Sequence, residues 1–149
     1  MKFGSRVASL QSMIEAAPDL SLGHRFLRAI TLRDWQGLER CFAPDATFRA
    51  VIPGKTPFRE HQGGAAAAGQ VSAWFKDGDV HEVLESDVGA IADRVRVRYR
   101  VRNHEPEGWF LVEQQAYLTL GPQGIEACNL ICSGFRPVAA PGGERPPAA

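Results

Sequence analysis

The stretch that decides the fold is DRVRVRYRVRNHEPEGWFLVEQQAYLTLGPQGIEACNLICSGF, from Asp93 to Phe135. In its first part, arginines at every second position alternate with apolar residues, and this period of two is typical of a strand with one buried and one exposed face. Turn-forming residues at 103–108 and 121–124 separate it from two segments rich in aromatic and branched side chains. The stretch therefore predicts a meander of three antiparallel strands.

The arginines assign the two faces of the first strand. Five arginines at alternate positions cannot all be buried, so Val95, Val97 and Tyr99 are expected to face the interior. Tyr99 is then the polar tip on that face. Its hydroxyl is either a catalytic hydrogen-bond donor or part of a core aromatic residue that bonds to the backbone.

Upstream of the meander, apolar residues recur at helical spacing in three segments. Ser21 and Asp34 are positioned as N-caps of the first two helices, and Pro44 is expected to enforce the end of the second. We expect helices at 21–32, at 35–42 and from 64 to the turn at 77–78, and strands at 47–52 and 80–88. This order predicts an α+β fold with about three helices packed on one face of a curved antiparallel sheet.

The ends of the chain differ in composition from its centre. Residues 1–19 form a short helix or an ordered arm, residues 20–137 form the domain, and residues 138–149, rich in Pro, Gly and Ala, form a disordered tail. The first 20 residues contain no uninterrupted apolar run, which predicts neither a signal peptide nor a membrane span.

The composition of the chain limits which classes of binding partner are expected. The chain has 149 residues, enough for one core, and its formal net charge is zero. Zero net charge leaves no electrostatic footprint for nucleic acid or an anionic membrane. Cys41, Cys128 and Cys132 have neither zinc-ligand spacing nor an even count, so we interpret them as buried free thiols of a cytoplasmic protein.

A family pattern appears in the segments Asp34-Trp35-Gln36-Gly37-Leu38 and Cys41-Phe42-Ala43-Pro44-Asp45-Ala46-Thr47-Phe48, followed by a helix and a closing meander. It resembles the SnoaL-like branch of the nuclear transport factor 2-like superfamily over about residues 20 to 137. The resemblance implies a conical α+β barrel with an apolar cavity between sheet and helices, and frequent homodimers. Family members include isomerases, cyclases, hydrolases, dehydratases and silent binding modules, so the fold alone assigns no function.

The chemistry of ketosteroid isomerases can be compared residue by residue. The position of their general base falls on Ala50, that of their oxyanion-hole tyrosine on Phe26, and that of their second carboxylic acid near Gln115. At all three positions the catalytic group is missing or replaced, which argues against the isomerase mechanism. The last strand, at 127–132, also lacks the carboxylate that the resemblance to aldol cyclases would require.

The strand at 109–120 has apolar residues on both faces, so its inward face is open to two interpretations. Simple burial favours the set Phe110, Val112, Gln114, Ala116, Leu118 and Leu120. The resemblance favours the set Trp109, Leu111, Glu113, Gln115, Tyr117 and Thr119. We favour the second, because a homodimer through the outer face would explain the remaining apolar residues there.

This choice predicts a site. Glu113 would act as proton shuttle, and Gln115 or Tyr99 would stabilise developing charge on an oxygen. The alternative is that Glu113 pairs with Arg98 or Arg100 on the sheet surface. The expected ligand-binding wall is Phe26, Ala50, Val97, Trp74 and His61.

The predicted function is cofactor-independent acid–base chemistry of the cyclase, isomerase, dehydratase or hydrolase type, on a small hydrophobic substrate. The alternative is a non-catalytic ligand-binding or dimerisation module of the same fold. We expect no metal and no cofactor, a small hydrophobic ligand, a homodimer, and no nucleic-acid or membrane partner.

Overall fold

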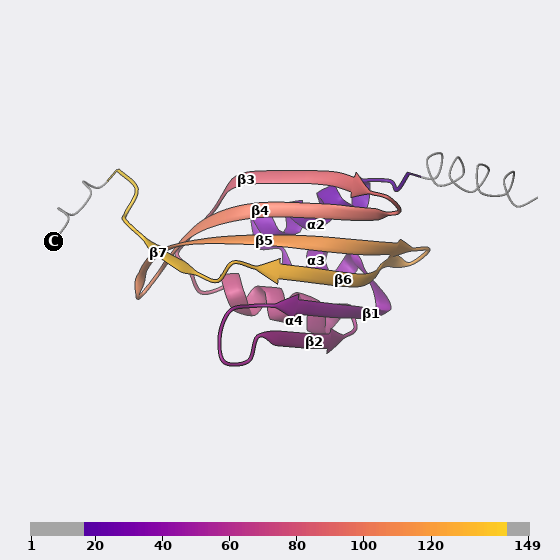
Figure 1. The fold of residues 1–149 in the computed structure, drawn as a ribbon, viewed down its shortest axis with the longest axis horizontal. Helices are drawn as coiled ribbons and strands as arrows, with labels where there is room; N and C mark the ends of the chain where they lie inside the picture. The colour runs from indigo at the N-terminus through magenta and orange to yellow at the C-terminus, as the bar shows by residue number, and fades with distance from the viewer. Residues whose placement is uncertain (1–16, 143–149) are drawn as a thin grey trace, which may run out of the picture.

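The computed structural model describes residues 17–142, in which three helices cover one face of a curved sheet (Figure 1). The helices are α2 (Ser21–Leu32), α3 (Trp35–Arg40) and α4 (Gly64–Phe75). The strands are β1 (Phe42–Val51), β2 (Phe58–Gln62), β3 (Val80–Ile91), β4 (Arg94–Glu105), β5 (Gly108–Gly121), β6 (Gly124–Cys132) and β7 (Arg136–Val138).

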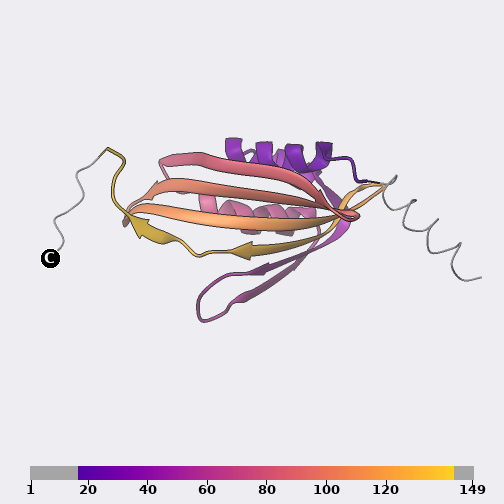
Figure 2. The same cartoon turned by 45° about the horizontal axis from the view of Figure 1, so that its top comes forward.

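The strands form one sheet in the order β2-β1-β6-β5-β4-β3, and β7 pairs with the start of β5. Neighbouring strands are antiparallel except β1 and β6, which run parallel. The hairpin of β1 and β2 curls away from the rest of the sheet (Figure 2). The predicted α+β cone is confirmed, although its sheet stays open, with β2 and β3 as the two edges.

Helix α2 lies close to the sheet because its contact face contains a glycine. A Cβ atom on Gly23 would come within 2.6 Å of the Val95 side chain, so any larger residue would force the helix outward. Phe26 and Ile30 on the same face are fully buried. The predicted cap at Ser21 is wrong, since Ser21 is the first helical residue and its backbone N–H donates to the Asp19 carboxylate.

Helix α3 begins at its predicted cap. The Asp34 carboxylate accepts the backbone N–H of Gly37 at 2.9 Å. The predicted end at residue 42 is wrong, because the helix stops at Arg40 and β1 begins at Phe42. Pro44 therefore lies inside β1, where the register with β6 shifts between Phe42 and Thr47 and a missing backbone donor is tolerated.

A single arginine joins the ends of two helices. Arg33 follows α2 with a left-handed φ of 53°, a conformation that costs free energy for a non-glycine residue. Its guanidinium donates to the carbonyl oxygens of Phe75, at 3.3 Å, and Gly78, at 2.7 Å. These bonds hold the end of α4 against the end of α2.

The predicted faces of β4 are confirmed. Val95, Val97 and Tyr99 are fully buried, and the arginines lie on the other face. Three ion pairs join this face to β3: Arg96 with Asp87, Arg100 with Glu85 at 3.7 Å, and Arg102 with Glu82 at 2.7 Å. Strand β4 continues into β5 through a turn of two residues, with Glu105 paired to Gly108.

The predicted ends of the chain lie mostly outside the described residues. The arm predicted at 1–19 falls there up to residue 16, and the predicted tail falls there from residue 143. Val138, which the prediction places in the tail, is instead the last residue of β7. No helix in the described part of the chain is long and apolar enough to cross a membrane.

Candidate functional site

The interior of the cone contains a chain of polar side chains that bond to one another. The Tyr99 hydroxyl donates to the Gln114 Oε1 at 2.7 Å, and both side chains are fully buried. The Gln114 Nε2 donates to the Cys132 Sγ at 3.4 Å, and the backbone N–H of Gly134 donates to the same sulfur. Burial raises the pKa of the Tyr99 phenol well above its ordinary value, so the hydroxyl remains a neutral donor.

The predicted inward position of Glu113 and Gln115 is wrong. In the β4–β5 ladder, Tyr99 is opposite Gln114, which turns the neighbours of Gln114 to the outer face. The Glu113 carboxylate lies 3.7 Å from Arg98 and 3.5 Å from Arg100. Gln115 donates to the Tyr117 hydroxyl on the same outer face. The core-facing set is therefore the one that burial alone favoured.

Three of the predicted ligand-wall residues are core residues. Phe26 and Val97 are fully buried, and Ala50 is 1% exposed. Ala50 lies opposite Leu130 of β6 and carries no titratable group. The position of the isomerase base is thus filled by a methyl group that packs in the core.

The other two predicted wall residues lie together beside α4. The Phe48 ring packs against His61 at 6.2 Å and against Trp74 at 6.3 Å between ring centres. The His61 Nε2 is 2.9 Å from the Gln70 Oε1. This hydrogen bond joins β2 to α4.

A groove opens where α4 ends against the start of β5, at the end of the sheet where β7 lies (left in Figure 1). It has a volume of about 290 Å³, and we call it the rim groove. It is lined by Ala73, Trp74, Glu105, Glu107, Phe110 and Phe135. The Phe135 ring packs on the buried Phe75 at 5.9 Å, which joins the groove to the core.

On the acidic side of the rim groove, the surroundings change the pKa of Glu105. Desolvation is the main cause that raises the pKa of Glu105 above its ordinary value, and the charge of Glu107 raises it further. Asp77 and Asp79 act in the same direction, and Arg33 acts against them. Within residues 17–142, neither Glu105 nor Glu107 lies within ion-pair distance of a cationic side chain.

A buried amide supports this acidic side. Asn103 is 1% exposed, and its Nδ2 donates to the Glu105 Oε1 at 3.1 Å. Because the carboxylate accepts this bond, the amide nitrogen must face it. The Asn103 Oδ1 is then a buried acceptor without a hydrogen-bond partner in the described part of the chain. Such atoms are rare and costly in folded proteins.

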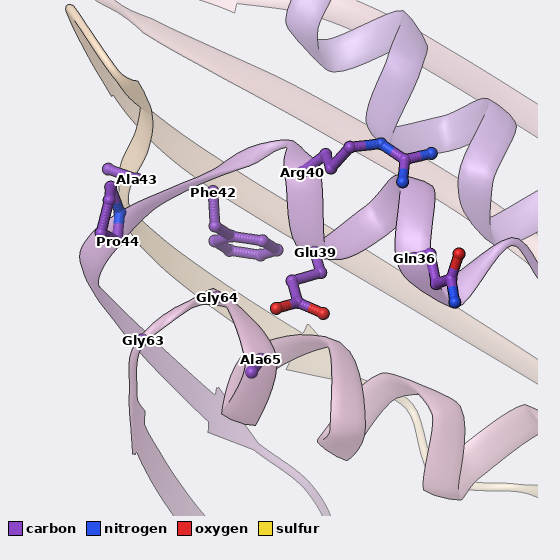
Figure 3. Close-up of a pocket in the computed structure, with 9 residues that line it drawn as sticks. All are labelled: Gln36, Glu39, Arg40, Phe42, Ala43, Pro44, Gly63, Gly64 and Ala65. Atoms are coloured by element: carbon purple, nitrogen blue, oxygen red, sulfur yellow. The ribbon is translucent and has the colours of Figure 1, made fainter.

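A larger hollow of about 680 Å³ lies at the other end of α4 (Figure 3). Figure 3 shows the Glu39 carboxylate beside the first turn of α4, close to Gly64 and Ala65. The N-cap residue Gly63 provides no side-chain cap, and a negative charge stabilises a helix N-terminus. Glu39 therefore gives this helix end a structural partner.

A third hollow of about 540 Å³ lies on the outer face of the sheet between the β1–β2 hairpin and strands β5 and β6. Phe58 beside it is 76% exposed and Ile131 is 57% exposed. Tyr117 also lines it. Exposed apolar side chains gathered in this way are typical of an interaction surface.

No group of three or more His, Cys, Asp or Glu side chains among residues 17–142 is arranged to hold a metal ion. The three cysteines are buried and free. Burial raises the pKa of the Cys128 thiol, so this sulfur remains protonated.

Most residues of the rim groove were not predicted from the sequence. Trp74 was expected in a ligand wall, but Glu105, Glu107 and Phe135 were assigned to a turn and a strand end. These residues come from three separate segments, so no local spacing connects them. A signal for Gln114 did exist, because a two-residue turn at Pro106-Glu107 places it opposite Tyr99.

Solved structures share this fold at low sequence identity. A protein with a ketosteroid isomerase-like fold from Catenulispora acidiphila, in complex with trimethylamine, is 15% identical with a TM-score of 0.58, over 73% of this chain and 82% of that one. A protein from Xanthomonas campestris proposed to be a polyketide cyclase is 16% identical with a TM-score of 0.60, over 74% and 87%.

A third similar structure is a cystatin-like protein of unknown function from Xanthomonas campestris, 14% identical with a TM-score of 0.61, over 76% of this chain and 88% of that one. These likenesses show the fold alone. No curated protein matches the sequence significantly. The family model described as "SnoaL-like domain" matches residues 24–120, from the first turn of α2 to the end of β5. This chain therefore belongs to the SnoaL-like domain family.

Proposed function

We propose that this chain is a small-ligand-binding member of the SnoaL-like family that holds its ligand in the rim groove and has no catalytic duty in the cone interior. The observation that carries the proposal is the pairing of the interior polar groups. Tyr99 and Gln114 bond to each other at 2.7 Å and are fully buried, so neither is presented to a ligand. A catalytic donor has to reach the reacting atoms of its substrate.

The outer position of Glu113 supports the same proposal. Its carboxylate lies 3.7 Å from Arg98 and 3.5 Å from Arg100, on the face opposite the helices. A proton shuttle needs access to its ligand. Glu113 has no such access to a ligand in the cone.

The rim groove has the features of a small binding site. Its walls include the rings of Trp74, Phe110 and Phe135, and its volume of about 290 Å³ is at the lower end of the usual range of ligand pockets. This size suits a molecule of few heavy atoms with an apolar part. The related Catenulispora protein in complex with trimethylamine supports a ligand of this size in the same fold.

An enzyme of the acid–base type is the second candidate, and Glu105 is the observation that favours it. Its pKa is raised by desolvation and by Glu107, and it lines the rim groove. A carboxyl group with a raised pKa beside an apolar wall can exchange a proton with a ligand. In this second candidate Glu105 replaces Glu113 as the proton shuttle, and no cofactor takes part.

One experiment separates the two candidates. A library of small apolar and polar molecules is screened by protein-observed NMR, and each binder is incubated with the protein and followed for conversion. We expect binders that shift the signals of Trp74 and Phe110 and are recovered unchanged. Conversion that is lost in Glu105→Gln would instead establish the enzyme, and a library without any binder at the rim groove would refute both candidates.

We also propose that a second copy of the chain covers the outer face of the sheet. Phe58 and Ile131 are exposed beside an apolar hollow, and the arginines and Glu113 nearby provide charged groups of both signs. A two-fold axis can pair such a surface with itself. Sedimentation at micromolar concentration tests this proposal, since a species of about twice the chain mass is expected.

A further inference from the structure

The rim groove combines aromatic walls with negative charge. Trp74, Phe110 and Phe135 line it together with Glu105 and Glu107. Ring faces carry negative electrostatic potential and attract cations. Carboxylates beside them add to this attraction, because their charge is not neutralised by any cationic side chain within 4.0 Å in the described part of the chain.

Two basic side chains near the rim groove bond to groups outside it. The Arg33 guanidinium donates to the carbonyl oxygens of Phe75 and Gly78. The His104 Nδ1 is 2.7 Å from Asp79. The two glutamates therefore remain available for a positively charged partner from outside the chain.

The buried Asn103 amide positions one carboxylate of the groove. Its nitrogen donates to the Glu105 Oε1 at 3.1 Å, and Glu105 lines the groove. This carboxylate is therefore held in place before a ligand binds, which reduces the entropy lost on binding.

We propose that the rim groove selects an organic cation, a small protonated or quaternary amine, over an uncharged molecule of the same shape. This inference rests on the proposed function, because it names the ligand class of the same groove. The ring faces surround the apolar substituents of the amine, and Glu105 and Glu107 neutralise its charge. The size of the groove limits the ligand to a headgroup of few carbon atoms.

The test uses two probes of nearly equal shape, choline and 3,3-dimethylbutan-1-ol, which differ in charge. Both are titrated into the full chain and followed by NMR at low salt. Choline is expected to bind at least about tenfold more tightly. Its affinity is expected to fall at least about fivefold in Glu105→Gln and Glu107→Gln, with that of the alcohol unchanged.

Asp93→Asn is the matched control, because it removes the same charge from the exposed turn between β3 and β4 at the opposite end of the sheet. It is expected to bind both probes as the wild type does. Trp74→Ala is expected to weaken both probes, which locates them in the groove.

The outcomes distinguish this inference from the proposed function. Equal affinity for both probes at the groove overturns the selection of a cation and leaves the binding function standing. Choline binding that is insensitive to both glutamate variants also overturns it. Failure of both probes to bind overturns the cation groove, and the library screen then decides separately whether the groove binds any ligand.

Discussion

The bond between Tyr99 and Gln114 predicts a thermodynamic cycle that tests whether the cone interior is dry core or a working site. Tyr99→Phe removes one hydroxyl and leaves the Gln114 Oε1, which is fully buried, without its donor. An acceptor left unpaired in this way costs about 1–3 kcal/mol of the free energy of unfolding. For a chain of this size, each kcal/mol lowers the melting temperature by about 2–4 °C.

The partner variant should behave in the same way. Gln114→Leu leaves the Tyr99 hydroxyl without an acceptor and also removes the bond to Cys132, so we expect a similar loss. In the double variant no polar group of this pair remains, and replacing both partners by apolar groups of similar shape is close to neutral. The two single losses sum to about 2–6 kcal/mol. The double variant is therefore expected to be more stable than that sum predicts by most of this amount.

Urea denaturation followed by circular dichroism measures all four proteins. Ligand affinity at the rim groove is measured in parallel and is expected to stay unchanged in Tyr99→Phe, since Tyr99 does not line the groove. Losses that simply add, or a Tyr99→Phe variant as stable as the wild type, would refute the argument that the pair is sealed from water. Loss of ligand binding in Tyr99→Phe would show that the hydroxyl belongs to the site.

Three further predictions concern other parts of the molecule. Glu113→Gln should cost less than about 1 kcal/mol and leave ligand binding unchanged, because its ion pairs with Arg98 and Arg100 are about 40% exposed; urea titrations at low and high salt check this. The pKa of His81 is lowered chiefly by desolvation, so the fold favours the neutral ring, and stability should fall as the pH drops below about 6.5, the unfolded value. This fall should be smaller in His81→Gln, and an unchanged pH profile would contradict the assignment. Ile131→Glu places a charge on an exposed apolar side chain of the outer face and should convert a dimer to monomers in sedimentation without unfolding the chain; a dimer that persists would move the interface elsewhere.

Strand β4 shows why part of the interior could be predicted from the sequence. Alternation alone gives two faces without saying which is buried, and the arginines decide the matter because five charges cannot all enter a core. Tyr99 is therefore placed correctly by composition. Once the position of the β4–β5 turn is known, the register determines which residues of β5 lie on the same face as Tyr99.

Strand β5 lacks such a marker, and the prediction there was wrong. Both of its faces include apolar residues and both include a glutamine, so composition did not separate them. The rim groove was harder still, because the end of α4, the β4–β5 turn and the bend before β7 meet only in the folded chain. The predicted nucleic-acid, cofactor and localisation properties stay predictions.

The length of the two-residue turn between Glu105 and Gly108 determines which side chains of β5 face the interior. Side chains alternate across a strand, so one residue inserted into this turn, with β4 held in place, would move every side chain of β5 to the opposite face. Glu113 and Gln115 would then enter the cone beside Tyr99, and Gln114 would leave it. A single insertion at the surface could thus exchange a neutral interior for an acidic one without any substitution, which makes indels in this turn as informative as substitutions when related chains are compared.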